Sequence, residues 1–119
     1  MIRIELPWPP RVLHPNSRVH WAQRARAAKA MRQAAAYCTL AAGIRRNDPD
    51  IPQAIKATIT FYPPNRHKHD VDGCLSAAKS LIDGVAEVIG VDDSKWKIVP
   101  LKADPIKGGV VKIELESGE

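Results

Sequence analysis

The feature that most constrains the fold of this chain is a repeated change in hydrophobic spacing, from every second residue to every third or fourth. Apolar and polar residues alternate over residues 2–6 and 55–61, as they do in strands with one buried face. Residues 18–42 and 71–89 instead repeat their apolar positions at the spacing of a helix. A chain with this alternation is expected to bury a sheet against helices.

The C-terminal part of the chain adds two more strands. Trp96, Ile98 and Leu101 fit a third strand, and residues 110–115 fit a fourth. The segment Lys107-Gly108-Gly109 between them has the composition of a tight turn and predicts a hairpin. Residues 1–119 are therefore predicted to form a single α/β (α+β) domain of order β-α-β-α-β-β. Its mixed sheet of about four strands is expected to carry two main helices.

The first predicted helix combines a buried stripe with a basic surface. The apolar positions expected to face the core are Trp21, Ala25, Ala28, Met31, Ala35, Cys38 and Ala42. Arg24, Arg26 and Lys29 lie off that stripe. We expect these three side chains to face solvent or the phosphates of a bound nucleic acid.

Charge and cysteine content indicate which binding partners and which cellular compartment are expected. A net charge of +5 and an isoelectric point near 9.5 favour a polyanionic partner such as nucleic acid, although basic domains also bind acidic membranes and acidic proteins. Cys38 and Cys74 lie among apolar residues, which favours free thiols in a reducing compartment. The first residues do not resemble a signal peptide and no apolar stretch is long enough to cross a bilayer, so we expect a cytoplasmic protein that does not enter membranes.

Two acidic pairs and one lysine form the most informative pattern. Asp70 and Asp72 stand where the second predicted helix begins, and Asp92 and Asp93 follow its end. Lys79 comes seven residues after Asp72, almost two helical turns, so the two side chains are expected to share a face. Paired carboxylates suit Mg²⁺, which takes oxygen ligands. From spacing alone the structural interpretation is favoured, in which Asp72 is a natural N-cap and Asp92-Asp93 is a common solvated turn after a helix.

Several other residues have both a functional and a structural interpretation. Asp83, four residues beyond the lysine, could hold it in a surface ion pair. His67 and His69 could bind a transition metal, but a loop position or a phosphate contact is favoured. Trp8 with its flanking prolines could be a recognition segment, and Trp96 could stack on a base. Packing is favoured for both tryptophans.

An ordered set of motifs spans nearly the whole chain. It consists of a first strand leading into Leu6-Pro7-Trp8-Pro9-Pro10, then Asp70-Val71-Asp72, Lys79, Asp92-Asp93 and Lys107-Gly108-Gly109. Together these motifs resemble the RusA family of Holliday-junction resolvases, and their order is more specific than any one of them. Two positions depart from the family pattern. Gly73 stands where an asparagine often follows the second aspartate, and His69 stands where an arginine can precede the first.

The resemblance implies a Mg²⁺-dependent endonuclease, with Mn²⁺ as a substitute, that acts as a homodimer. It assigns the metal to Asp70, Asp72 and Asp93, with Asp92 as an alternative ligand. Lys79 joins the three aspartates as a catalytic residue, although its interval from Asp72 is about one helical turn longer than in the best-known member. The residues expected to contact DNA are Arg24, Arg26, Lys29, Arg66, Lys68 and His69.

The expected substrate is branched DNA, above all the four-way junction, which a dimer would resolve by paired symmetric nicks. One alternative is a basic domain that binds DNA without cutting it, in which the aspartates are caps and turns. A second alternative is a flap nuclease or a general structure-specific nuclease.

Overall fold

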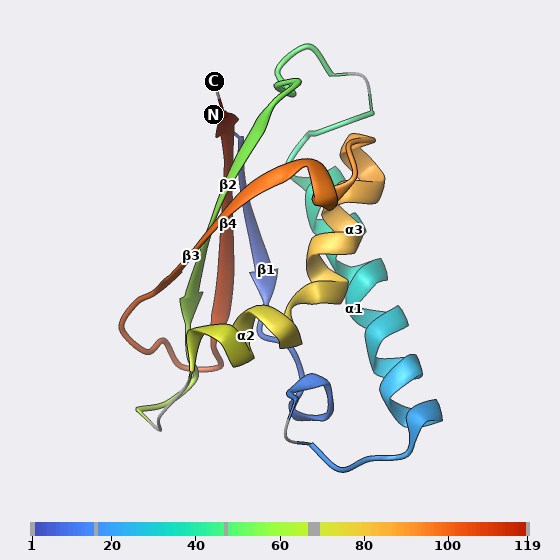
Figure 1. Cartoon of the computed structure of the whole chain (residues 1–119), viewed down its shortest axis with the longest axis vertical. Helices are drawn as coiled ribbons and strands as arrows, with labels where there is room; N and C mark the ends of the chain where they lie inside the picture. Colours follow the sequence, from blue (N-terminus) through green and yellow to red (C-terminus); the bar gives the residue numbers. More distant parts are fainter. Residues whose placement is uncertain (1, 16, 47, 67–69, 119) are drawn as a thin grey trace.

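In the computed structural model, the residues that are described form one mixed sheet of four strands in the order β1-β4-β2-β3 (Figure 1). The structure describes residues 2–15, 17–46, 48–66 and 70–118. Its strands are β1 (Ile2–Pro7), β2 (Ile55–Tyr62), β3 (Trp96–Lys102) and β4 (Val110–Ser117). Its helices are α1 (Trp21–Ala41), α2 (Val71–Ala77) and α3 (Lys79–Ile89), with short 3₁₀ helices η1 (Arg11–Leu13) and η2 (Asp93–Lys95). The predicted α/β domain with a mixed sheet is confirmed.

The strand register explains how the core is built. β4 is antiparallel to both β1 and β2, so that Ile113 lies opposite Ile4 on one side and Ile59 on the other. All three side chains are buried. They face α1 and α3, which lie together on one face of the sheet (Figure 1). The alternating sequence pattern thus places one apolar face of the sheet under two helices.

The predicted hairpin between the last two strands is wrong. β2 lies between β3 and β4 and pairs with both, in parallel with β3 and antiparallel with β4. The turn at Gly108-Gly109 is present, with both residues at positive φ, but it carries the chain past β2. A turn signal in the sequence specifies a change of direction and does not specify which strand the chain then joins.

The two large helices approach each other closely at one glycine. A Cβ atom built at Gly84 of α3 would lie 2.3 Å from the carbonyl oxygen of Arg32 and 2.8 Å from Cβ of Ala35, both in α1. No side chain fits at that distance. Gly84 therefore permits the close α1–α3 packing that buries Ala35 completely.

Trp8 and Trp96 are packing residues, as the sequence favoured. The ring of Trp8 meets Phe61 edge-on, with ring centroids 6.2 Å apart. Gly109, at φ 71°, lies against the same indole, because a Cβ there would be 2.8 Å from Cγ of Trp8. Trp96 is 7% exposed and its Nε1 donates to the carbonyl of Val91 at 3.2 Å. The proline-rich segment and the glycine turn therefore meet through the indole of Trp8.

The prediction that Trp21 is a core residue is wrong. Its side chain is 75% exposed, and Ala25 and Ala42 at other positions of the same stripe are also exposed. The middle of the stripe is covered, since Ala35 is buried and Met31 packs against the core. Helical periodicity identified the correct face of α1, but α1 is longer than the surface that covers it.

No helix in the part of the chain that the structure describes is long and apolar enough to cross a membrane.

Candidate functional site

The second predicted helix is two helices that meet at Ala78. This residue, at φ −88° and ψ 1°, ends α2 and begins α3, and the two helices run in different directions (Figure 1). The order is therefore β-α-β-α-α-β-β, with one helix more than predicted. The prediction that Asp72 and Lys79 share the face of one helix is wrong, because Asp72 lies in α2 and Lys79 in α3.

Lys79 is the centre of a charged cluster at the start of α3. Its Nζ donates to Oδ1 of Asp83 at 2.8 Å and also to Oδ2 of Asp93. The side chain of Lys79 is 59% exposed and that of Asp93 only 17%. The chain leaves α3 through Gly90, in the left-handed conformation, and η2 turns back so that Asp93 reaches the beginning of the helix. The return of the chain is a tertiary feature with no local signal.

The cluster stabilises the charged form of the lysine. Hydrogen bonds to Asp83 and then to Asp93 raise the pKa of Lys79 above its ordinary value of 10.5. Asp92, the N-cap of η2, accepts a hydrogen bond from the Ser94 amide at 3.0 Å. This bond is the main reason that the pKa of Asp92 is lowered. At neutral pH the cluster thus presents the charged ammonium of Lys79, hydrogen-bonded to Asp83 and Asp93.

The other acidic pair lies at the start of α2. Asp70 has an extended backbone and is the N-cap, with Oδ1 accepting from the amide of Asp72 at 3.4 Å. The prediction of Asp72 as the N-cap is therefore wrong, since Asp72 is within the first turn. Both carboxylates are exposed. They are accessible to a ligand from solvent.

The donor chemistry of these aspartates suits Mg²⁺, but their arrangement gives no ready-made cage. Among the described residues, no group of three or more His, Cys, Asp or Glu side chains is placed to hold a metal ion. Mg²⁺ commonly needs only one or two protein carboxylates together with water and phosphate, so the exposed pair at Asp70 and Asp72 is chemically adequate. Asp93 already has a cation against it, the ammonium of Lys79. Metal binding by Asp70, Asp72, Asp93 or Asp92 stays a prediction.

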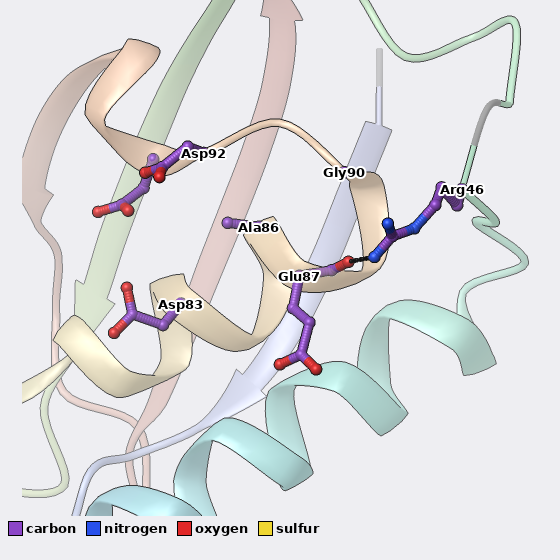
Figure 2. Close-up of a pocket in the computed structure, with 7 residues that line it drawn as sticks. Arg46, Asp83, Ala86, Glu87, Gly90 and Asp92 are labelled. Atoms are coloured by element: carbon purple, nitrogen blue, oxygen red, sulfur yellow. Dashed lines mark hydrogen bonds between the residues drawn. The ribbon is translucent and has the colours of Figure 1, made fainter.

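A pocket of about 350 Å³ lies beside the charged cluster, between α3 and the segment that follows it (Figure 2). Its lining residues are Arg46, Asp83, Ala86, Glu87, Gly90, Asp92 and Asp93. Nη2 of Arg46 donates to the carbonyl of Glu87, the bond drawn dashed in Figure 2. The two atoms are 2.7 Å apart, although the residues are 41 positions apart in sequence. Neither Arg46 nor Glu87 was predicted to line a site, because nothing in their local sequence marks this contact.

The cations predicted to contact DNA are distributed over the surface. Arg26 and Lys29 are exposed on α1, and Arg66 is exposed in the loop before α2. Arg24 is half-buried and its Nη2 donates to the carbonyl of Ser17 at 2.8 Å, so it also has a structural role. Lys68 and His69, with the neighbouring His67, lie outside the residues that the structure describes.

Fold and site together define a mixed α/β domain with an exposed lysine–aspartate cluster at one end of α3. No family model matches the chain. A protein of Xylella fastidiosa (strain Temecula1 / ATCC 700964), described as an uncharacterized protein, is 36% identical to it over 107 residues. The match covers 90% of this chain and 70% of the relative. The chain belongs to the same family as this protein, and its function has to be argued from its own residues.

Proposed function

We propose that the protein is a Mg²⁺-dependent endodeoxyribonuclease that cuts branched DNA, with the four-way junction as its preferred substrate. The observation that carries the proposal is the contact between Lys79 and Asp93. This contact places a lysine beside an acidic side chain from a different element, and the resemblance to the RusA family gives both residues a catalytic role. A solvent-accessible lysine–carboxylate cluster on a basic protein suits the chemistry of a phosphodiester.

We assign the charged residues separate roles in DNA cleavage. Lys79 is positively charged at neutral pH and is exposed enough to approach a phosphate, where it would stabilise the charge that develops during cleavage. Asp83 and Asp93 hold the ammonium in place. Asp70 and Asp72 would hold the metal, and the resemblance to the RusA family adds Asp93 or Asp92 as a third ligand. Bound Mg²⁺ would supply Lewis acidity at the phosphate.

The net charge of the protein supports DNA as the substrate, and the symmetry of a four-way junction supports a homodimer. The net charge of +5 favours binding to the DNA backbone, and this binding should weaken steeply as salt is raised. A four-way junction presents paired equivalent strands. A two-fold homodimer would present one cluster to each of them. The proposal therefore includes a dimer, and sedimentation that finds only monomer at micromolar concentration, with and without junction DNA, would contradict this part of it.

The test is cleavage of a labelled synthetic four-way junction in Mg²⁺, with unlabelled linear duplex as competitor. The wild type is compared with Asp72→Asn and with Asp104→Asn, a control that neutralises an exposed aspartate in the loop before β4. We expect paired symmetric nicks from the wild type and the control. Asp72→Asn should bind the junction as well or more tightly, because a negative charge facing phosphate is removed, and should not cut it. Undiminished cleavage by Asp72→Asn would overturn the assignment.

A domain that binds DNA without cutting it is the second candidate. Lys79 forms ion pairs with both Asp83 and Asp93. An ion-pair cluster with a purely structural role would have the same arrangement, which favours this candidate. Binding by such a domain would be salt-sensitive but indifferent to Mg²⁺. Tight junction binding with no cleavage in Mg²⁺ or Mn²⁺ would select it. Flaps cut in preference to four-way junctions would instead identify a flap nuclease.

A further inference from the structure

The N-terminal end of α1 extends beyond the helix that it packs against. α1 has 21 residues and α3 has 11, so at the usual helical rise α1 is about 15 Å longer. In Figure 1 the first turns of α1, at its lower end, lie past the start of α3. Trp21 is the first residue of α1 and shares the stripe of buried Ala35 and Thr39, yet it is 75% exposed. A tryptophan on the core-facing stripe is thus left open to solvent.

The backbone that carries the exposed indole is fixed by contacts at the start of the helix. Nδ1 of His20, the N-cap, accepts from the amide of Ala22 at 3.1 Å. The ring of His20 lies 5.5 Å from that of Trp21, at an interplanar angle of 32°. Arg24 ties the preceding segment to the helix through the carbonyl of Ser17. Trp21 therefore begins an ordered, capped helix, and a ligand that stacks on it meets a backbone already fixed in place.

The charged residues along the chain on either side of this indole are all basic. Residues 6–47 contain eight of the 18 lysines and arginines and none of the 13 aspartates and glutamates. Arg26 and Lys29 are exposed within the first three turns of α1. The first turn of α1 contains no acidic residue. An exposed aromatic ring in a cationic segment of this length matches a polyanion that also carries flat, apolar groups, which is the chemistry of nucleic acid.

We propose that Trp21, with His20 beside it, stacks on an unpaired DNA base while Arg26 and Lys29 bind the adjacent phosphates. A base inside a duplex has neighbours on both faces and offers no face to an indole. A base at a branch point, a gap or a single-stranded end does. The inference rests on the proposed function only in taking DNA as the partner. It requires no cleavage, so binding in EDTA tests it independently of the nuclease proposal.

The test measures binding of a fluorescent single-stranded oligonucleotide, and of the matching duplex, by polarisation in EDTA. Trp21→Ala is compared with Trp21→Phe, which keeps an aromatic face. Tyr37→Ala is the matched control, because Tyr37 is 73% exposed on the same helix, four turns from Trp21. We expect Trp21→Ala to bind the single strand about 10- to 100-fold more weakly and the duplex nearly as well as the wild type. Trp21→Phe should retain most of the affinity, and the control should retain all of it.

A second measurement reports on the ring itself. Trp8 is packed against the core and Trp96 is buried, so quenching of tryptophan fluorescence on adding the single strand should come from Trp21 and disappear in Trp21→Phe. Equal weakening of single strand and duplex in Trp21→Ala would overturn the stacking proposal, and so would unchanged binding to both. A change from dimer to monomer on sedimentation of Trp21→Ala would show instead that a second copy of the chain covers the indole.

Discussion

The ammonium of Lys79, at the first residue of α3, contacts the carboxylate of Asp93, which lies fourteen residues further along the chain. This contact holds the segment that follows α3 against the first turn of the same helix. It also joins residues that the sequence could only place at opposite ends of a helical segment. The proposed active site depends on this contact.

Replacement of Lys79 by glutamine should separate catalysis from stability. The lysine is largely exposed, so loss of its ion pairs is expected to cost about 0.5–1 kcal/mol of unfolding free energy. Loss of a charge that stabilises the transition state should lower the rate of junction cleavage by about 100-fold or more. Single-turnover cleavage and thermal unfolding check both quantities. Asp83→Asn is the control, because it leaves the Asp93 contact intact and should reduce the rate by less than about tenfold. Wild-type cleavage by Lys79→Gln would remove this residue from the mechanism.

Substitution by alanine should have opposite effects on stability at Gly84 and at Gly73. Gly84→Ala inserts a methyl group where the Arg32 carbonyl already lies, so it should lower the unfolding free energy by about 1–3 kcal/mol. At Gly73, in α2, a Cβ would meet only Cβ of Asp70 at 3.8 Å, an ordinary contact. Gly73→Ala should therefore stabilise the protein by about 0.5–1 kcal/mol. Urea unfolding measures both free energies, and a Gly84→Ala variant as stable as the wild type would contradict the packing described for α1 and α3.

Cys38 should react slowly with alkylating reagents in the folded protein. Burial raises its pKa above the ordinary value of 9.0, which reduces the fraction of reactive thiolate. The folded state disfavours the Cys38 thiolate. The contribution of the neutral Cys38 thiol to the stability of the protein is therefore complete below pH 9.0 and is lost as the pH rises through the folded pKa. The rate of Cys38 alkylation is tested with iodoacetamide near neutral pH. Mass spectrometry compares labelling of the native protein with labelling of the urea-unfolded protein. The fall in unfolding free energy above pH 9 should be smaller in Cys38→Ala than in the wild type.

Arg46 should contribute to stability through a single long-range contact. Its hydrogen bond to the Glu87 carbonyl satisfies one of the free carbonyl groups at the C-terminal end of α3. Arg46→Ala is expected to lower the unfolding free energy by about 0.5–1.5 kcal/mol, which corresponds to a few degrees in the melting temperature. Arg66→Ala, which removes an exposed loop arginine, is the comparison and should leave the melting temperature within about a degree. Equal melting temperatures for the two variants would show that the Arg46 contact contributes little.

Sequence periodicity predicted the elements well and their partners poorly. The strand over residues 55–61 and the buried faces of β1 and β4 follow directly from alternation, because successive side chains of a strand point to opposite faces. The break at Ala78 was missed. The apolar stripe continues through it, and alanine carries no signal for the end of a helix.

The candidate site was predicted in part. Its residue types and their positions at the ends of helices could be found in the sequence, and the ion pair between Lys79 and Asp83 follows from helical spacing. The return of Asp93 to Lys79 and the contact of Arg46 with α3 could not be found there. Both depend on the path of the backbone between distant residues.

The sequence by itself determined which face of β1, β2, β4 and the middle of α1 is turned to the core, because the local geometry of helices and strands fixes the direction of each side chain. Only the tertiary structure decided that β4 lies between β1 and β2, and that the core-facing stripe of α1 begins with an uncovered Trp21. Local periodicity contains no information about how far a neighbouring element extends. Strand order and the exposure of Trp21 are set by packing between segments far apart in the chain.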